Sequence, residues 1–257
     1  MSDHKKVKKV SMKKQRVKLN ATQIIAIGFA AIILLGAALL NLPAASRSGE
    51  SCGFFPALFT ATSATCVTGL VVVPTVSSWS VFGQVVILAL IQIGGLGFMT
   101  IATVFSMALK RRMGLRERMT MVESINNDNV GGILNLTKLI VIGTAIFEGI
   151  GALLLSTRFI PEYGVATGIR YSVFHSISAF CNAGIDIISE NSLCEYATNP
   201  IINIVTSLLI VTGGIGYIVW WDFIRVIKLY KTHGLKCFKF MTLHSKIAVS
   251  MTAMLIF

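Results

Sequence analysis

Long stretches without a charged side chain dominate this chain. Residues 24–42, 81–109 and 201–221 carry no charge over 19, 29 and 21 positions, and residues 139–157 carry one, Glu148. About 20 apolar residues in a helix cross the hydrocarbon core of a bilayer. Only 13% of the residues are charged, against about 25% in soluble domains. The sequence therefore predicts an all-α membrane protein with four spanning helices.

The basic residues are concentrated in three places. Of the 23 lysines and arginines, eight precede the first apolar stretch, five lie between residues 110 and 118, and six lie between 225 and 246. Because cytoplasmic loops carry an excess of basic residues, we expect a multi-pass protein of the plasma membrane with a cytoplasmic N-terminus. The net charge of +12 by itself would suit nucleic acid. Its distribution argues against nucleic acid and indicates membrane lipid as a partner.

One segment of the chain returns in altered form. ALFTATSATCVTGL, residues 57–70, shares five of its 14 positions with SVFHSISAFCNAGI, residues 172–185, and IGGLGF at 93–98 returns as TGGIGY at 212–217. Residues 54–65 and 170–180 are apolar but too short to span, since they make about 15–18 Å of helix. Each precedes a glycine-bearing extended stretch. The sequence therefore predicts re-entrant half-helices in two span–pore-loop–span units.

We expect the two extended stretches to bind a cation through their backbone carbonyls. A cation that leaves water needs oxygen dipoles in place of its hydration shell, and extended backbone supplies a row of carbonyls. Gly69 and Gly184 permit backbone angles that aim these carbonyls at one axis. Each half-helix points its partially negative C-terminal end at the same place. Thr68 and Asn182 either add side-chain oxygens or brace the loops, and Cys66 is interpreted as a small packing residue, like Cys181.

Other polar or small residues leave alternatives open. Glu148, inside a span, is either a functional carboxylate or a buried brace near the half-helix. Asp186 either concentrates cations at the outer mouth or is a solvated loop residue, and His175 is interpreted as a packing residue. Cys52 and Cys194 either form a disulfide or remain free thiols. The second glycine motif is interpreted as a place of close helix packing or bending. It comprises Gly94, Gly95, Gly97, Gly213, Gly214 and Gly216.

The chain divides into six parts by this reasoning. They are a basic cytoplasmic N-terminus (1–21), a first repeat (22–109), a link (110–135), a second repeat (136–227), a link (228–245) and the start of a truncated third repeat (246–257). Because residues 247–257 are too few to cross a bilayer, we expect a fragment of a longer chain. The rival hypothesis is a complete two-repeat protein that dimerises into a four-segment pore. Hydrolase and nucleotide-binding signatures are absent from the sequence, so we expect no enzyme and no covalently bound cofactor.

TATSATCVTGL, IQIGGLGFMT, HSISAFCNAGID and TGGIGY follow one another in the order and spacing of a known superfamily. Together they resemble the Trk/Ktr/HKT potassium transporters, most closely the membrane subunits of bacterial Ktr systems. The resemblance covers essentially the whole chain after the basic N-terminus. It implies four repeats around one pore, two of which lie here, a homodimer, and a cytosolic ring of nucleotide-binding regulatory subunits.

The resemblance also assigns residues. It implies a potassium selectivity filter with eight residues in this chain: Val67, Thr68, Gly69, Leu70, Asn182, Ala183, Gly184 and Ile185. Glycine at 69, where sodium-selective relatives have serine, implies a preference for potassium as substrate, with sodium as an activator. The family's gating loop and its basic residue in the last repeat fall beyond residues 1–257. The resulting hypothesis is the N-terminal half of a potassium uptake transporter. The alternative is a non-conducting membrane scaffold or regulatory subunit.

Overall fold

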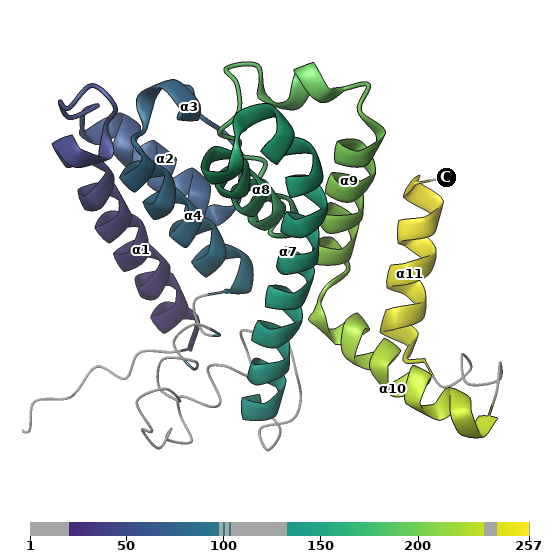
Figure 1. The fold of residues 1–257 in the computed structure, drawn as a ribbon. Helices are drawn as coiled ribbons and strands as arrows, with labels where there is room; N and C mark the ends of the chain where they lie inside the picture. Colours follow the sequence, from purple (N-terminus) through teal and green to yellow (C-terminus); the bar gives the residue numbers. More distant parts are fainter. Residues whose placement is uncertain (1–20, 98–99, 101–102, 104–132, 234–240, 257) are drawn as a thin grey trace, which may run out of the picture.

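The computed structural model describes residues 21–97, 100, 103, 133–233 and 241–256 (Figure 1). In these ranges the chain is helical and forms no β-strand, apart from one isolated antiparallel pairing between Ser46 and Trp79. This confirms the expected all-α class. The helices are α1 (Ala21–Leu40), α2 (Phe54–Cys66), α3 (Thr75–Ser78), α4 (Val81–Leu96), α7 (Ile133–Tyr163), α8 (Val165–Phe180), α9 (Pro200–Ile215), α10 (Tyr217–His233) and α11 (Leu243–Ile256), with short 3-10 turns at Pro43–Ala45 and Ser192–Tyr196.

Of the four predicted spans, the described residues show two as single helices and a third as a bent pair of helices. Among the described helices, only α1 and α7 are each long and apolar enough to cross a membrane. The predicted span 201–221 is bent by 93° between α9 and α10. The predicted span 81–109 ends as a helix at Leu96, and most of its remainder lies outside the described residues. Both breaks fall at a glycine with positive φ, Gly97 at 79° and Gly216 at 90°, where an α-helix cannot continue.

Two groups of three helices make up the bundle. The short helix α2 packs against both α1 and α4, and α8 packs in the same way against α7 and α9. A contact between α4 and α8 joins the two groups. The 13 residues of α2 make about 20 Å of helix, so it reaches only part of the way through a hydrocarbon core of about 30 Å.

The second short helix begins earlier than the sequence predicted. It starts at Val165, not at residue 170, and has 16 residues. The reason is a tight corner: α7 continues to Tyr163, and Gly164 turns the chain with φ of 80°. Gly168 then packs so closely on α7 that a Cβ there would lie 2.6 Å from the Cα of Ile160.

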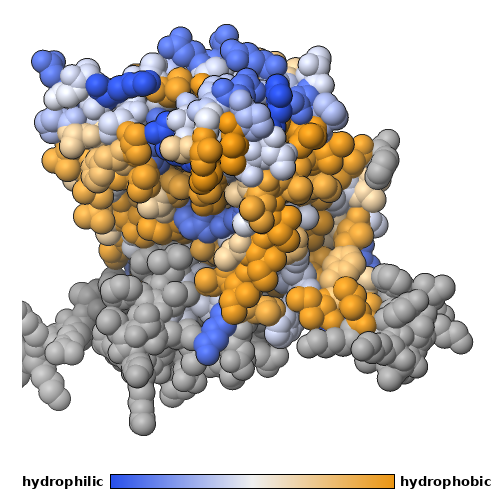
Figure 2. Space-filling model, viewed as in Figure 1, coloured by the Kyte–Doolittle hydropathy of each residue, from blue (hydrophilic) through white to orange (hydrophobic). Residues whose placement is uncertain are grey.

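Large apolar side chains cover the outside of the bundle. Leu35, Leu153 and Leu255 are 64%, 70% and 82% exposed, and Figure 2 shows a broad hydrophobic band below a hydrophilic end. A soluble protein rarely exposes so large an apolar surface. The band lies where α1, α7 and α9 present their lipid-compatible sides, so the protein is a membrane protein.

Polar contacts fix the connecting segments at both ends of the bundle. The hydroxyl of Tyr196 donates to Glu162 (2.8 Å) and lies 2.8 Å from the hydroxyl of Tyr163. Burial raises the pKa of Tyr196, and the bonds to Tyr163 and Glu162 raise it further, so the phenol stays neutral. At the opposite end, the backbone N–H and hydroxyl of Thr242 donate to Asp222 (2.7 and 3.0 Å), which ties the start of α11 to α10.

Candidate functional site

The end of α2 turns sharply into an extended segment. Val67 adopts the left-handed conformation (φ 57°, ψ 44°) directly after the helix. The backbone N–H of Thr68 donates to the carbonyl of Ser63 (3.0 Å), and the two hydroxyl groups of these residues lie 3.0 Å apart in a hydrogen bond. The Thr68 side chain thus braces the turn, which is one of the two roles that the sequence left open for it.

The end of α8 repeats this turn in the same register. Asn182 takes the left-handed conformation (φ 59°), and the N–H of Ala183 donates to the carbonyl of Ser178 (2.7 Å). The Ser178 hydroxyl donates to the carbonyl of Ile185 (2.6 Å). The amide of Asn182 donates to the carbonyl of Ile210 on α9 (3.4 Å), so this side chain also braces its loop. The sequence repeat is therefore a repeat of local structure as well.

The two extended segments meet at their glycines. Gly69 and Gly184 have φ of 73° and 66°. A Cβ built on Gly69 would lie 2.7 Å from the carbonyl oxygen of Ala183, and a Cβ on Gly184 would lie 3.6 Å from the Cα of Gly69. Positions 115 residues apart in the chain thus bring backbone against backbone, because neither carries a side chain.

The second glycine motif lies against the ends of the short helices. A Cβ on Gly94 would overlap the carbonyl oxygen of Thr65, and a Cβ on Gly213 would overlap that of Phe180. A Cβ on Gly95 would likewise overlap the side chain of Cys181, so the glycine leaves room for that side chain. These contacts agree with the close-packing interpretation and place α4 and α9 directly behind the two turns.

Glu148 lies behind the second turn and is 9% exposed. The amide of Gln92 on α4 donates to its carboxylate (3.2 Å), and the thiol of Cys181 donates to the other carboxylate oxygen (3.9 Å). The hydroxyl of Ser176 donates to the backbone carbonyl of Glu148 (2.6 Å). The Glu148 carboxylate therefore joins α4, through the Gln92 amide, to the end of α8, through the Cys181 thiol. Sequence reasoning missed Gln92, whose signal was an amide in an otherwise apolar stretch.

Comparison of the sequence with known proteins identifies the family of this chain. The family model for TrkH, described as a cation transport protein, matches residues 2–256. The chain belongs to the TrkH family. It is 43% identical over 247 residues to the potassium/sodium uptake protein NtpJ of Enterococcus hirae, covering 96% of this chain and 52% of that protein.

Two further relatives of this TrkH-family chain are called Ktr system potassium uptake protein B. That of Bacillus subtilis is 43% identical over 239 residues, covering 93% of this chain and 51% of the relative. That of Vibrio alginolyticus is 37% identical over 244 residues, covering 95% and 51%. The superfamily resemblance is thereby confirmed. The chain spans about half the length of these curated relatives.

The structure also places three other polar candidates of the TrkH-family chain: His175, Cys52 and Cys194. His175 is buried, its Nδ1 lies 2.8 Å from the carbonyl of Tyr171, and its ring packs near that of Phe159. Cys52 and Cys194 are free thiols, so the disulfide alternative was wrong. In the described ranges no group of three or more histidine, cysteine or acidic side chains is arranged to hold a metal ion.

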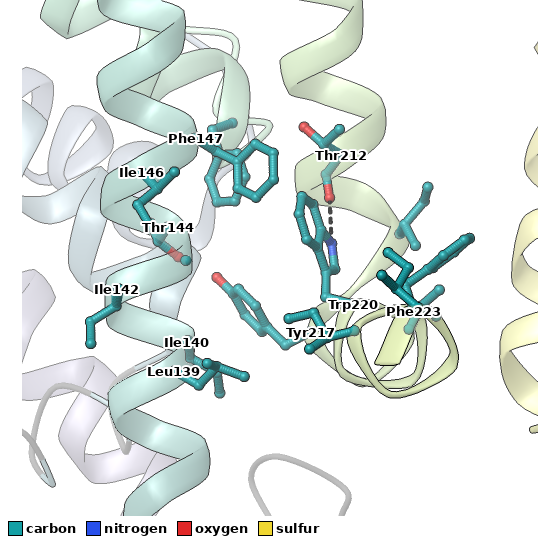
Figure 3. Close-up of a pocket in the computed structure, with 16 residues that line it drawn as sticks. Leu139, Ile140, Ile142, Thr144, Ile146, Phe147, Thr212, Tyr217, Trp220 and Phe223 are labelled. Carbon is teal, nitrogen blue, oxygen red and sulfur yellow. Dashed lines mark hydrogen bonds between the residues drawn. The ribbon is translucent and has the colours of Figure 1, made fainter. Parts of the chain in front are cut away.

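An apolar cavity of about 500 Å³ lies in the angle between α7 and the bend from α9 to α10 (Figure 3). Trp220 closes one side of it. Its indole N–H donates to the carbonyl of Thr212 (3.1 Å), and its ring meets Phe147 edge-on with centroids 4.0 Å apart. In a straight helix that carbonyl would accept from the N–H of Gly216. Trp220 therefore replaces a hydrogen bond that the bend removes.

Proposed function

We propose that this chain is the N-terminal half of a channel-like transporter that takes up potassium across the plasma membrane. The observation that carries the proposal is the meeting of Gly69 and Gly184 at the ends of two short apolar helices. The names of the relatives support the choice of cation, since all three given above are potassium or potassium/sodium uptake proteins.

The two extended segments form half of a selectivity filter in this proposal. Carbonyls of residues 67–70 and 182–185 replace the hydration shell of potassium. The C-terminal ends of α2 and α8 carry partial negative charge toward the same place. The ion moves inward down its electrochemical gradient, since one charge gains about 2.3 kcal/mol per 100 mV of membrane potential. No covalent chemistry or bound cofactor takes part, and sodium acts as an activator.

The proposal assigns the rest of the molecule as well. Residues 22–109 and 136–227 are two of four span–pore-loop–span repeats, and residues 246–257 begin the third. The basic N-terminus and the links 110–135 and 228–245 lie in the cytoplasm, as the positive-inside rule requires. The transporter is a homodimer in lipid. A cytosolic ring of nucleotide-binding subunits regulates it, which the word system in the relatives' names supports.

Potassium uptake by the complete reading frame, expressed in a bacterium without its own potassium uptake, tests the proposal. We expect the wild type to restore growth at low potassium. Gly184→Asp, which puts a carboxylate where the two backbones meet, should abolish uptake or lower its selectivity for potassium over sodium. The matched control is Gly143→Ala on α7, where an added Cβ meets nothing within 4 Å.

Three outcomes separate the hypotheses. Uptake lost in Gly184→Asp and kept in the control supports the filter assignment. Uptake by Gly184→Asp equal to that of the wild type refutes it. If the wild type reaches the membrane with a regulatory subunit and still transports nothing, the scaffold hypothesis replaces the transporter.

A further inference from the structure

The bend from α9 to α10 leaves an apolar cavity of about 500 Å³ against α7 (Figure 3). This volume lies in the range of about 300–1,000 Å³ that ligand sites occupy. Isoleucine, leucine and phenylalanine side chains make up most of the wall, and the indole N–H of Trp220 is already used in its bond to the carbonyl of Thr212. Such a wall offers water few hydrogen-bond partners. The cavity therefore suits an apolar occupant.

The cavity opens on an apolar face of α7. Ile142 and Ile146 line it from this helix, and both side chains are exposed. The same helical face continues with the exposed side chains of Ile150 and Leu153. The helix α11 contacts α9 and α10, but none of its described residues lines the cavity. An acyl chain of the surrounding bilayer can therefore reach it.

The helix α10 has the sequence and the direction of an interfacial helix. It leaves α9 at an angle of 93°, so it runs nearly in the plane of the bilayer when α9 stands along the membrane normal (Figure 1). Its sequence, YIVWWDFIRVIKLYKTH, begins with apolar and aromatic residues and ends with basic ones. Tryptophan, tyrosine and basic residues gather at the depth of lipid headgroups. The cavity, which α10 bounds, therefore lies next to the headgroups.

Two cations flank the cavity at this end. Lys138 on α7 and Arg225 on α10 are each next in sequence to a residue that lines it. Both side chains are exposed, and neither forms an ion pair among the residues that the structure describes. The carboxylate of Asp222 on α10 accepts two hydrogen bonds from Thr242. A protein helix laid over the cavity would bury the two cations in an apolar contact, whereas a phosphate group would pair with them.

We propose that this cavity binds an anionic phospholipid of the cytoplasmic leaflet. One acyl chain lies between α7 and α10, and the phosphate group lies beside Lys138 and Arg225. The site takes its orientation from the proposed function, which places this end of the bundle in the cytoplasm, where the leaflet carries anionic lipid. Each cation beside such a headgroup strengthens binding about fivefold. The bound lipid fills the angle that the bend leaves between the helices.

Native mass spectrometry of the complete transporter, titrated in detergent with phosphatidylglycerol or with phosphatidylcholine of the same acyl chains, tests the inference. Gly143 lines the cavity, and a Cβ there meets nothing within 4 Å, so Gly143→Phe fills the space without a backbone clash. Gly149→Phe is the matched control, because Gly149 is equally open and does not line the cavity. We expect Gly143→Phe to lose one phosphatidylglycerol per chain that the wild type and the control retain.

The headgroup is tested by removing each cation. Lys138→Gln and Arg225→Gln should each weaken the binding of phosphatidylglycerol about fivefold, because each removes one charge beside the phosphate. Both should leave the binding of phosphatidylcholine, which has no net charge, unchanged.

Equal binding of phosphatidylglycerol by the wild type and Gly143→Phe overturns the inference, and this result is expected if a later helix of the complete chain covers the cavity. Equal binding of the two phospholipids by the wild type, or an equal loss in Gly149→Phe, also overturns it. If Gly143→Phe does not accumulate in the membrane, the charge variants decide: weaker binding of phosphatidylglycerol supports the inference, and unchanged binding overturns it. A wild type that binds the lipid but takes up no potassium refutes the proposed function and leaves this site standing.

Discussion

Gly69 and Gly184 look alike in sequence but differ in their surroundings. Both have positive φ, which costs an alanine about 1–2 kcal/mol. At Gly69 a Cβ would also lie 2.7 Å from a backbone oxygen, whereas at Gly184 its nearest neighbour would be 3.6 Å away. We expect Gly69→Ala to lower the apparent melting temperature of the purified protein more than Gly184→Ala, and to reduce potassium uptake more.

Thermal unfolding in detergent and uptake in cells measure these effects. Gly49→Ala is the control for backbone strain alone, because Gly49 has φ of 77° and nothing within 4 Å of an added Cβ. Equal losses in Gly69→Ala and Gly184→Ala would contradict the close approach of the two loops.

The helices α4 and α9 depend on glycines that face the ends of the short helices. A Cβ on Gly94 or Gly213 would overlap a carbonyl oxygen of α2 or α8. Overpacking of this kind typically costs 1–3 kcal/mol. We therefore expect Gly94→Ala and Gly213→Ala to destabilise the protein and to lower its yield from membranes.

The contrasting substitution is made in α7. Gly143 and Gly149 are helical and meet nothing within 4 Å, so alanine there should be neutral or stabilising by up to about 1 kcal/mol. Melting temperatures that fall equally for all four variants would show that helix conformation, and not packing against the turns, explains the effect.

At the scale of the whole molecule, the positive-inside rule sets the expected orientation. Cys194 is exposed in the loop after the second extended segment, which the proposal places outside the cell. Cys237 belongs to the basic link 228–245, placed inside, and lies beyond the described residues. We expect a membrane-impermeant maleimide to label Cys194 on intact cells and to label Cys237 only after permeabilisation.

Single-cysteine variants of the complete transporter make this measurement, with the cysteine-free protein as the blank. Labelling of Cys237 on intact cells, with Cys194 protected, would reverse the orientation and with it the direction proposed for the filter.

The sequence predicted the elements better than their geometry. Apolar runs located α1, α2 and α7, and glycines in the sequence marked the turns at residues 69 and 184. It left close packing and bending as alternatives at the break after Ile215, because the hydropathy of an apolar run is the same whether the helix is straight or bent by 93°. It also placed the start of α8 five residues too late, since the corner at Gly164 depends on packing against α7.

What the sequence determined by itself is the helical class, the entry into a membrane and the internal repeat, because hydropathy and glycine placement act over a few neighbouring residues. Only the tertiary structure decided that Gly69 meets Gly184 and that Gln92 reaches Glu148. The physical reason is distance along the chain. A contact between residues 56 or 115 positions apart depends on how several helices pack together, and no local pattern in the sequence records that arrangement.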